Sequence, residues 1–424
     1  MTADPLQAAL AACDRIDATD REILSFVAEP GRRERVREQA AGVCRQWADA
    51  PQAPPLYGLP AGVKDVFRVD GVPTRAGSDV PPDILDGPQA EAVSRLRAAG
   101  AVVAGKTVTT EFAFFAPGPT RNPRDHRHTP GGSSSGSAAA VAAGLVPLAL
   151  GTQTIASIIR PAAYCGLAGF RPSYGRVPAD GVIAFAPSLD TVGWFAPDVA
   201  GLTRAAAVLC DDWRPAAAGP GLPVLGIPVG PYLEHAGKEA LAAFAASASA
   251  LRAAGHRVRE VPALADFGAV QRQLFVITRY ELAREHAARF ARYGALYRPQ
   301  TAAAIRDGQA LTDAEHAAAL RGQATLRRDL AALMDDTGVD AWITPAATGP
   351  APAGLASTGD PVMSVPWSLA GFPAVSLPAG EFGGLPVGLQ CVGRPGQDEL
   401  LLALAAGLRM ITEDSPPPEP ANLP

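Results

Sequence analysis

Two serine-containing turns and one lysine carry the chemistry that this sequence offers. Gly131-Gly132-Ser133 opens a run of small residues, and Ser157 ends a second turn of small residues 24 positions later. A serine hydroxyl becomes a good nucleophile only when a neighbouring base takes its proton. Lys64 follows a glycine turn in LPAGVKDVF and is one of only three lysines among 37 basic residues. Lysine, unlike arginine, can lose its proton near neutral pH, so Lys64 is the candidate base.

The first serine turn also allows two other interpretations. Gly131 and Gly136 have the spacing of a phosphate-binding P-loop, but Ser137 stands where that motif needs lysine. Residues 132–136 match the GxSxG of a hydrolase nucleophile elbow, which must follow a strand. The preceding RNPRDHRHTP is a polar loop instead. A plainer alternative is that the serines cap a helix beginning near Ser137.

The histidines do not supply an evident base or metal site. His126 and His128 form an HxH in a polar loop, accompanied only by Asp125. A transition-metal site usually gathers more ligands of this kind, so we interpret them as surface histidines and expect no metal.

The composition excludes several classes of protein. A content of 48% hydrophobic and 19% charged residues is typical of a globular chain, and a net charge of −5 argues against a nucleic-acid partner. The odd, scattered cysteines predict reduced thiols and a cytoplasmic location. The start lacks the pattern of a signal peptide, and the most apolar run, 138–150, is too short to span a membrane.

The elements that must position these residues indicate an α/β fold. An N-terminal helical segment, 1–50, precedes a core, 57–200, that carries the serine turns. Helix-then-strand pairs recur at 88–105, 137–150 and 239–261. Such alternation predicts helices layered on both faces of a mixed, mostly parallel sheet.

The second half of the chain continues this pattern. We expect a helical excursion over 262–338, a closing helix over 398–409 and further strands, at 341–345, 375–377 and 387–392. No internal repeat or clean linker appears, so one domain over residues 1–412 is predicted. The proline-rich tail, 413–424, is expected to be mobile.

Long motifs in a fixed order resemble the amidase signature family over roughly residues 55–405. They are GVKDVF (62–67), TEFAF (110–114), TRNP (120–123), PGGSSSGSAAAVAAG (130–144), RPAAYCGLAGFRPSYGRV (160–177), APSLDTVG (186–193), DAWITPAA (340–347), TGDPVMSVPWSLAGFPAVSLPAG (358–380) and GLPVGLQCVGRP (384–395). The resemblance implies a single α/β/α domain around a large mixed sheet and a Ser–cis-Ser–Lys triad, with no metal or organic cofactor.

Carried over to this sequence, the resemblance implies Ser157 as nucleophile, Ser133 after a cis peptide bond as bridge and Lys64 as base. For Lys64 to accept a proton, its pKa must fall from about 10.4 to near 8 through desolvation. The family stabilises the oxyanion with backbone N–H groups of the second turn, which are here those of Thr154, Ile155, Ala156 and Ser157.

The second turn departs from the common family form, T-D-T-G-G-S-[IV]-R. Gln153 replaces the acid, Ile155 and Ala156 replace two glycines, and Ile159 occupies the arginine position, with Arg160 one step later. A β-branched residue strongly disfavours positive φ, so Ile155 has ordinary φ or the turn is strained. We expect a narrower, more apolar pocket, for which the candidate lining residues are Phe114, Phe115, Gln153, Trp194 and Trp367.

The sequence thus predicts a hydrolase that cleaves a small uncharged amide, carbamate or ureide through an acyl-enzyme. One alternative is the A subunit of a glutamine-dependent amidotransferase. The other is a catalytically impaired binding protein of the same fold, suggested by Ile155 and Ala156. The sequence leaves the oligomeric state open, a homodimer included.

Overall fold

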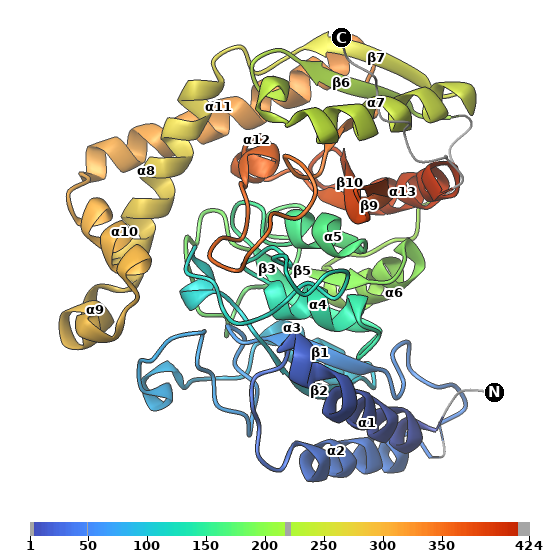
Figure 1. The fold of residues 1–424 in the computed structure, drawn as a ribbon, viewed down its shortest axis with the longest axis vertical. Coiled ribbons are helices and arrows are strands. Elements are labelled where there is room, and N and C mark those ends of the chain that lie inside the picture. Colours follow the sequence, from blue (N-terminus) through green and yellow to red (C-terminus); the bar gives the residue numbers. More distant parts are fainter. Residues whose placement is uncertain (1–3, 49, 217–221, 414–424) are drawn as a thin grey trace.

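A single mixed sheet runs along the molecule in the computed structural model, which describes residues 4–48, 50–216 and 222–413 (Figure 1). Its ten described strands lie in the order β2-β1-β3-β5-β4-β9-β10-β8-β6-β7. Their bounds are β1 Pro60–Lys64, β2 Val102–Thr107, β3 Leu148–Gln153, β4 Ala168–Arg171, β5 Thr191–Ala196, β6 Val224–Val229, β7 Arg257–Pro262, β8 Ala341–Pro345, β9 Ala374–Phe382 and β10 Leu385–Val392.

The sheet is mixed as expected, but the prediction that it is mostly parallel is wrong. Parallel pairs form its two ends, β2-β1-β3 and β8-β6-β7. Five of the nine pairs among the described strands, all in the centre, are antiparallel. The helix–strand alternation that indicated parallel pairing occurs toward the ends. In the centre, Gly383-Gly384 joins β9 to β10 directly, and a helix-free loop joins β4 to β5.

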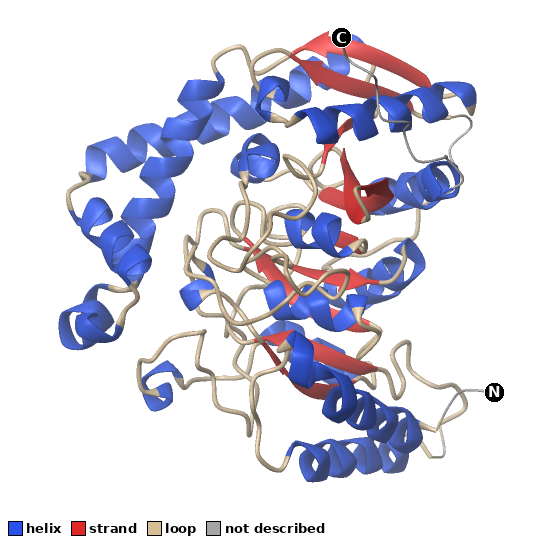
Figure 2. Cartoon of the chain, viewed as in Figure 1, coloured by secondary structure: helices blue, strands red, loops and turns tan. Residues whose placement is uncertain are grey.

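Helices cover both faces of the sheet (Figure 2). On β5, Trp194 donates a hydrogen bond to the carbonyl of Leu202 in α6, whereas Phe195 joins the buried cluster that contains Ala138 of α4 and Ala162 of α5. Successive side chains of a strand point to opposite faces, so these contacts define a three-layer α/β/α arrangement. The helices are α1 Pro5–Ile23, α2 Arg32–Gln46, α3 Glu91–Ala98, α4 Ser135–Ala142, α5 Ile159–Cys165, α6 Val199–Leu209, α7 Lys238–Ala253, α8 Phe267–Glu285, α9 Ala287–Tyr293, α10 Pro299–Gln309, α11 Asp313–Thr337, α12 Val365–Ala370 and α13 Asp398–Glu413.

The helical segments lie where the sequence placed them. Helices α1 and α2 pack on each other beside β2 at one end of the sheet, and α8 to α11 project along its flank (Figure 1). Helix α13 closes the described chain, so the tail expected to be mobile lies outside the described residues from 414 onward. No described helix is both long enough and apolar enough to cross a membrane.

Helix α4 sits unusually close to its neighbours because its residues are small. A Cβ added to Gly136 would lie 2.2 Å from the carbonyl oxygen of Ser25 and 2.4 Å from the amide nitrogen of Val108, so only glycine fits there. The second glycine of the GxSxG pattern therefore serves close packing. The pattern also lies in a loop and the start of α4, and a loop instead of a strand precedes it, as the sequence predicted.

Candidate active site

The site is assembled at the edge of the sheet where β1 and β3 end. Lys64 is the last residue of β1 and is fully buried. Its Nζ lies 2.7 Å from Ser133 Oγ and 2.8 Å from Thr152 Oγ1 on β3. Burial lowers the pKa of Lys64 to about 7, an effect that the negative charge of Asp190 partly opposes. A large fraction of Lys64 is therefore uncharged near neutral pH.

Ser133 is held by the loop that leads into α4. The Gly132–Ser133 peptide bond is cis, and Gly131 has a φ of 80°. The carbonyl oxygen of Ser133 accepts a hydrogen bond from the amide of Thr110, and the carbonyl of Gly132 accepts one from Arg160 Nη2 at 2.7 Å. These contacts orient the Ser133 hydroxyl toward Lys64.

Ser157 lies at the end of the turn that follows β3 and is only 8% exposed. It lines one small pocket together with Ser133. No hydrogen bond joins the two hydroxyls within the described chain, so the structure places them in the same pocket without linking them directly. Of the two contacts that the relay requires, only the one between Ser133 and Lys64 is present in the described chain.

The turn itself presents unpaired backbone donors. Within the described residues, the N–H groups of Ile155, Ala156 and Ser157 have no backbone or side-chain acceptor. Neither Ile155 nor Ala156 is among the described non-glycine residues with positive φ. The sequence left open whether Ile155 has an ordinary φ or a strained positive φ, and the structure shows the ordinary one.

Gln153 fixes this turn through hydrogen bonds of its side-chain amide. Its Oε1 accepts hydrogen bonds from the amides of Ile158 and Ile159 at 2.8 and 3.0 Å. Its Nε2 donates to Ser368 Oγ at 2.9 Å, and Ser368 Oγ donates to the carbonyl of Ile155 at 2.6 Å. Gln153 is buried and is not among the residues that line the pocket, so the structure places it under the turn and corrects its assignment to the pocket wall.

Asp190 is a residue of the site that we did not single out from the sequence. Its carboxylate accepts hydrogen bonds from Thr154 Oγ1 at 2.5 Å and from the amides of Phe185 and Ala186. Burial raises its pKa to about 6, with the hydrogen bonds and the charge of Lys64 acting against that rise. Asp190 is the one acidic residue of the APSLDTVG motif, which resembles the family, and this was the sequence feature that could have marked it as a site residue.

The walls of the pocket are largely apolar and aromatic. Phe114 and Phe115 line it as expected, and so does Phe185, whose ring packs edge-on against Phe114 at 5.4 Å. Phe112 and Ala113 just before them have φ values of 48° and 58°, a sparsely populated conformation that turns this segment into the pocket.

The other two aromatic candidates lie elsewhere. Trp194 is fully buried between the sheet and α6, and Trp367 is fully buried with its Nε1 donating to Tyr232 Oη. Neither lines the pocket with Ser157. The structure corrects both assignments, because a motif's position in sequence does not say which face of an element its side chain occupies.

Arg160 places a guanidinium in the wall of the pocket that contains Ser157. It lines the pocket, although Ile159 at the usual arginine position is buried. Its Nη1 donates to the carbonyl of Gly359 at 2.6 Å and its Nη2 to Thr358 Oγ1 at 3.1 Å, in addition to Gly132. Burial lowers the pKa of Arg160. Its terminal N–H groups thus brace the loop that carries Ser133.

The two other lysines have different surroundings. Lys106 is buried and its Nζ lies 2.9 Å from Asp65 Oδ1 and 3.0 Å from Thr74 Oγ1, a structural contact beside β1. The side chain of Lys238 is 84% exposed at the start of α7.

Comparisons with known proteins identify the family to which the chain belongs. A family model described as Amidase matches residues 7–402. The chain is 34% identical to the A subunit of Glutamyl-tRNA(Gln) amidotransferase from Synechococcus sp. (strain WH7803), over 92% of this chain and 90% of that protein. It is 33% identical to a crystal structure of an amidase, with a TM-score of 0.87 over 96% of each chain. The native peptide amidase from Stenotrophomonas maltophilia is 28% identical, with a TM-score of 0.81 over 98% of this chain and 95% of that one. The chain therefore belongs to the amidase signature family.

Proposed function

We propose that this protein hydrolyses the C–N bond of a small uncharged amide, carbamate or ureide through an acyl-enzyme on Ser157. The observation that carries the proposal is the 2.7 Å contact between the buried Lys64 Nζ and Ser133 Oγ, in the pocket that also contains Ser157. Membership in the amidase family supports the reaction class.

In the first step, neutral Lys64 Nζ accepts the proton of Ser133 while Ser133 Oγ accepts the proton of Ser157. The net result is an ammonium on Lys64 and a bond from Ser157 Oγ to the substrate carbonyl carbon. Thr152 Oγ1 accepts a hydrogen bond from Nζ and keeps the amine directed at Ser133. Lys64 is already partly neutral near pH 7, so this transfer needs no other base.

The carbonyl oxygen, now an oxyanion, is stabilised by backbone N–H groups of Thr154, Ile155, Ala156 and Ser157, all of which line the pocket. One such donor is typically worth about 3 kcal/mol in the transition state. The C–N bond then breaks as the relay returns a proton to the leaving nitrogen. Water, deprotonated through the same relay, releases the acid from Ser157.

The pocket suggests which substrates are accepted. Phe114, Phe115, Phe185 and Ile155 offer apolar contact, and Ile155 occupies space that glycine leaves open in the common family form. Arg160 already donates three hydrogen bonds to protein oxygens from Nη1 and Nη2, and its buried Nε has no described partner. These features favour a small, uncharged acyl group.

The test is Ser157→Ala in a screen of amides, carbamates and ureides. We expect hydrolysis of every responsive substrate to fall by at least about a thousandfold. Ser135→Ala is the matched control, because the described contact of its hydroxyl is a long one, 3.5 Å to the carbonyl of Val108. Unchanged turnover in Ser157→Ala would refute the proposal.

A second candidate function is that of an amidotransferase component that releases ammonia from glutamine for a partner protein. Relatives described as the A subunit of Glutamyl-tRNA(Gln) amidotransferase match over nearly the whole chain, so the comparisons support this candidate better than small-amide hydrolysis. This candidate predicts glutaminase activity that rises when a co-purifying partner is added. Turnover of simple amides by the isolated chain, with no response to glutamine, would instead support the first proposal.

A non-catalytic binding role is the remaining alternative. Ile155 has an ordinary φ, and the N–H groups of the turn have no protein acceptor, so both features favour a catalytically active turn over an impaired one. Stoichiometric labelling of Ser157 by a fluorophosphonate would exclude this alternative, and persistent failure to label would favour it. The cytoplasmic location and a homodimer stay predictions.

A further inference from the structure

The loop of residues 185–190, which leads into β5, faces the candidate active site with both of its ends. Phe185 at its start lines the pocket that contains Ser157. Asp190 at its end accepts a hydrogen bond from the turn after β3, and its negative charge favours the ammonium form of Lys64. The position of this short loop therefore affects both the wall of the pocket and the proposed base.

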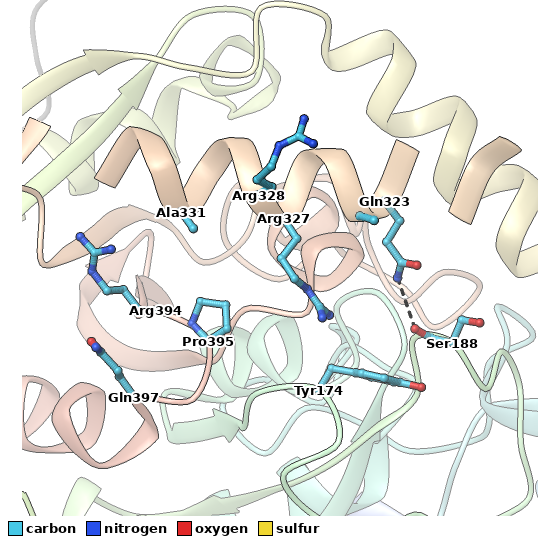
Figure 3. A pocket seen from close by; sticks show the side chains of 10 residues that line it. Tyr174, Ser188, Gln323, Arg327, Arg328, Ala331, Arg394, Pro395 and Gln397 are labelled. Atoms are coloured by element: carbon cyan, nitrogen blue, oxygen red, sulfur yellow. Dashed lines mark hydrogen bonds between the residues drawn. The ribbon is translucent and has the colours of Figure 1, made fainter. Parts of the chain in front are cut away.

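The middle of the loop is held from the outside by α8 and α11. The N–H and the hydroxyl of Ser188 both donate to the carboxylate of Glu281 on α8, at 2.9 and 2.5 Å. The carbonyl of Ser188 accepts a hydrogen bond at 3.3 Å from Nε2 of Gln323 on α11, which is the dashed line in Figure 3. Every polar group of Ser188 thus bonds to the helices inserted between β7 and β8.

Glu281 is a buried carboxylate with few partners. It is 7% exposed, and within the described residues it forms no ion pair with lysine or arginine. Besides Ser188, it contacts Nε2 of His316 on α11 at 2.8 Å, and the ring of His316 stacks on Tyr280 with centroids 4.2 Å apart. Burying a carboxylate is costly unless hydrogen bonds replace its water. Two of the three described hydrogen bonds of Glu281 join it to Ser188 of the 185–190 loop.

Packing alone does not fix this side of the loop. A cavity of about 610 Å³ lies beside it and is lined by Ser188, Gln323 and Tyr174, among other residues (Figure 3). Tyr174 Oη donates to the carbonyl of Pro187 at 2.8 Å, but Tyr174 is itself 40% exposed. The loop therefore borders open space here, and hydrogen bonds to buried groups such as Glu281 determine its position.

We propose that Glu281 is a positioning residue for the hydrolytic reaction, which it serves by fixing Ser188 and thereby holding Phe185 and Asp190 at the site. The inference rests on the proposed function. Glu281 is not among the residues that line the pocket with Ser157, so it acts through the 185–190 loop and not on the substrate.

The test is the rate at which a fluorophosphonate labels Ser157, measured across pH, because labelling needs the proton relay but no knowledge of the substrate. In Glu281→Ala the loop loses two hydrogen bonds, and we expect the rate to fall by about tenfold. The acid limb of the profile should move to lower pH by about half a unit, because Asp190 is held less closely to Lys64. Glu285→Ala, an exposed position one turn along α8, is the matched control and should stay within about twofold of the parent.

A double mutant separates the position of the loop from the charge of Glu281. Asp190→Asn removes the charge that the loop holds near Lys64. In that background, Glu281→Ala should move the acid limb no further if it acts through Asp190. A direct effect of the Glu281 charge on Lys64 would instead add to the shift caused by Asp190→Asn, and additive shifts would overturn the positioning role.

Ser188→Ala repeats the test if Glu281→Ala fails to fold, since it deletes one of the two bonds and keeps the N–H bond. It should give the same changes at smaller size, and Ser188→Thr, which keeps the hydroxyl, should behave like the parent. Profiles of Glu281→Ala or Ser188→Ala equal to that of Glu285→Ala, with the parent labelled at Ser157, would overturn this inference alone. Absence of labelling in the parent would overturn the proposed function together with it.

Discussion

Lys64 and Asp190 are two buried ionisable groups whose protonation states depend on each other. Burial drives the pKa of the lysine down to about 7 and that of the aspartate up to about 6. Each charge stabilises the other, so the negative charge of Asp190 keeps the pKa of Lys64 higher than burial alone would. At this scale, activity should rise with pH as Lys64 loses its proton near pH 7.

Asp190→Asn should move that rise to lower pH. Asparagine can still accept from the amides of Phe185 and Ala186, but it removes the negative charge that favours the ammonium form of Lys64. The pKa of Lys64 therefore falls, by up to about one unit, and the acid limb of the kcat/KM profile shifts in the same direction. A profile that loses amplitude without moving would show that Asp190 has only a structural role.

Lys64→Arg should abolish turnover while keeping the positive charge. Arginine is not deprotonated at any pH at which the protein is folded, so Ser133 would face a permanent cation; we expect a loss of about a thousandfold or more. The same exchange at Lys238, whose side chain is exposed, is the control and should leave the rate unchanged. Substantial activity in Lys64→Arg would mean that another group takes the proton.

At the scale of the element, the turn after β3 is tied to α12 through Gln153 and Ser368. The amide of Gln153 both accepts from the turn and donates to Ser368, which in turn holds the carbonyl of Ile155. A carboxylate at this position can accept the same N–H groups but cannot donate to Ser368. The amide thus lets two segments more than 200 residues apart position the N–H groups that we propose bind the oxyanion.

Gln153→Glu and Ser368→Ala should each reduce kcat by about tenfold and leave KM within about twofold, because they affect N–H groups that bind the developing oxyanion. The measurement is steady-state kinetics on the best substrate from the screen. Ser376→Ala is the control, since Ser376 Oγ on β9 is buried without a described partner. An increase in KM with unchanged kcat would instead assign Gln153 to substrate binding.

At the scale of the whole molecule, the buried Lys64 amine lowers the stability of the fold. Its pKa is about 7 in the folded chain against 10.5 for an ordinary lysine, so between these values the unfolded chain binds more protons than the folded one. The free energy of unfolding must then increase with pH across that window. The cost of keeping an uncharged amine at the site is largest at pH 7 and below.

Lys64→Met should therefore stabilise the protein at pH 7, by on the order of 2 kcal/mol after the lost contacts to Ser133 and Thr152 are subtracted. Thermal melting of both proteins at several pH values measures the difference. It should shrink as the pH rises toward 10. A melting temperature that falls at pH 7, or a difference independent of pH, would contradict the depressed pKa of Lys64.

Local patterns were enough to predict the elements that carry the site. The small residues of α4 and the turn before Ser157 lie where the sequence predicted them, whereas the glycine turn expected before Lys64 is in fact strand β1, Pro60–Lys64. Their order also resembled one family, whose membership the comparisons show. These features depend on side-chain size and on spacing along the chain, which the sequence states directly.

Contacts between distant segments decided the rest. Helix–strand alternation could not predict that the central strands pair antiparallel, because pairing depends on which strands become neighbours in space. The positions of Trp194 and Trp367 in the core, the partnership of Gln153 with Ser368 and the coupling of Asp190 to Lys64 arise in the same way. The sequence by itself thus determined which groups could react, whereas the tertiary structure decided their protonation and surroundings, because burial and charge are properties of the packed chain.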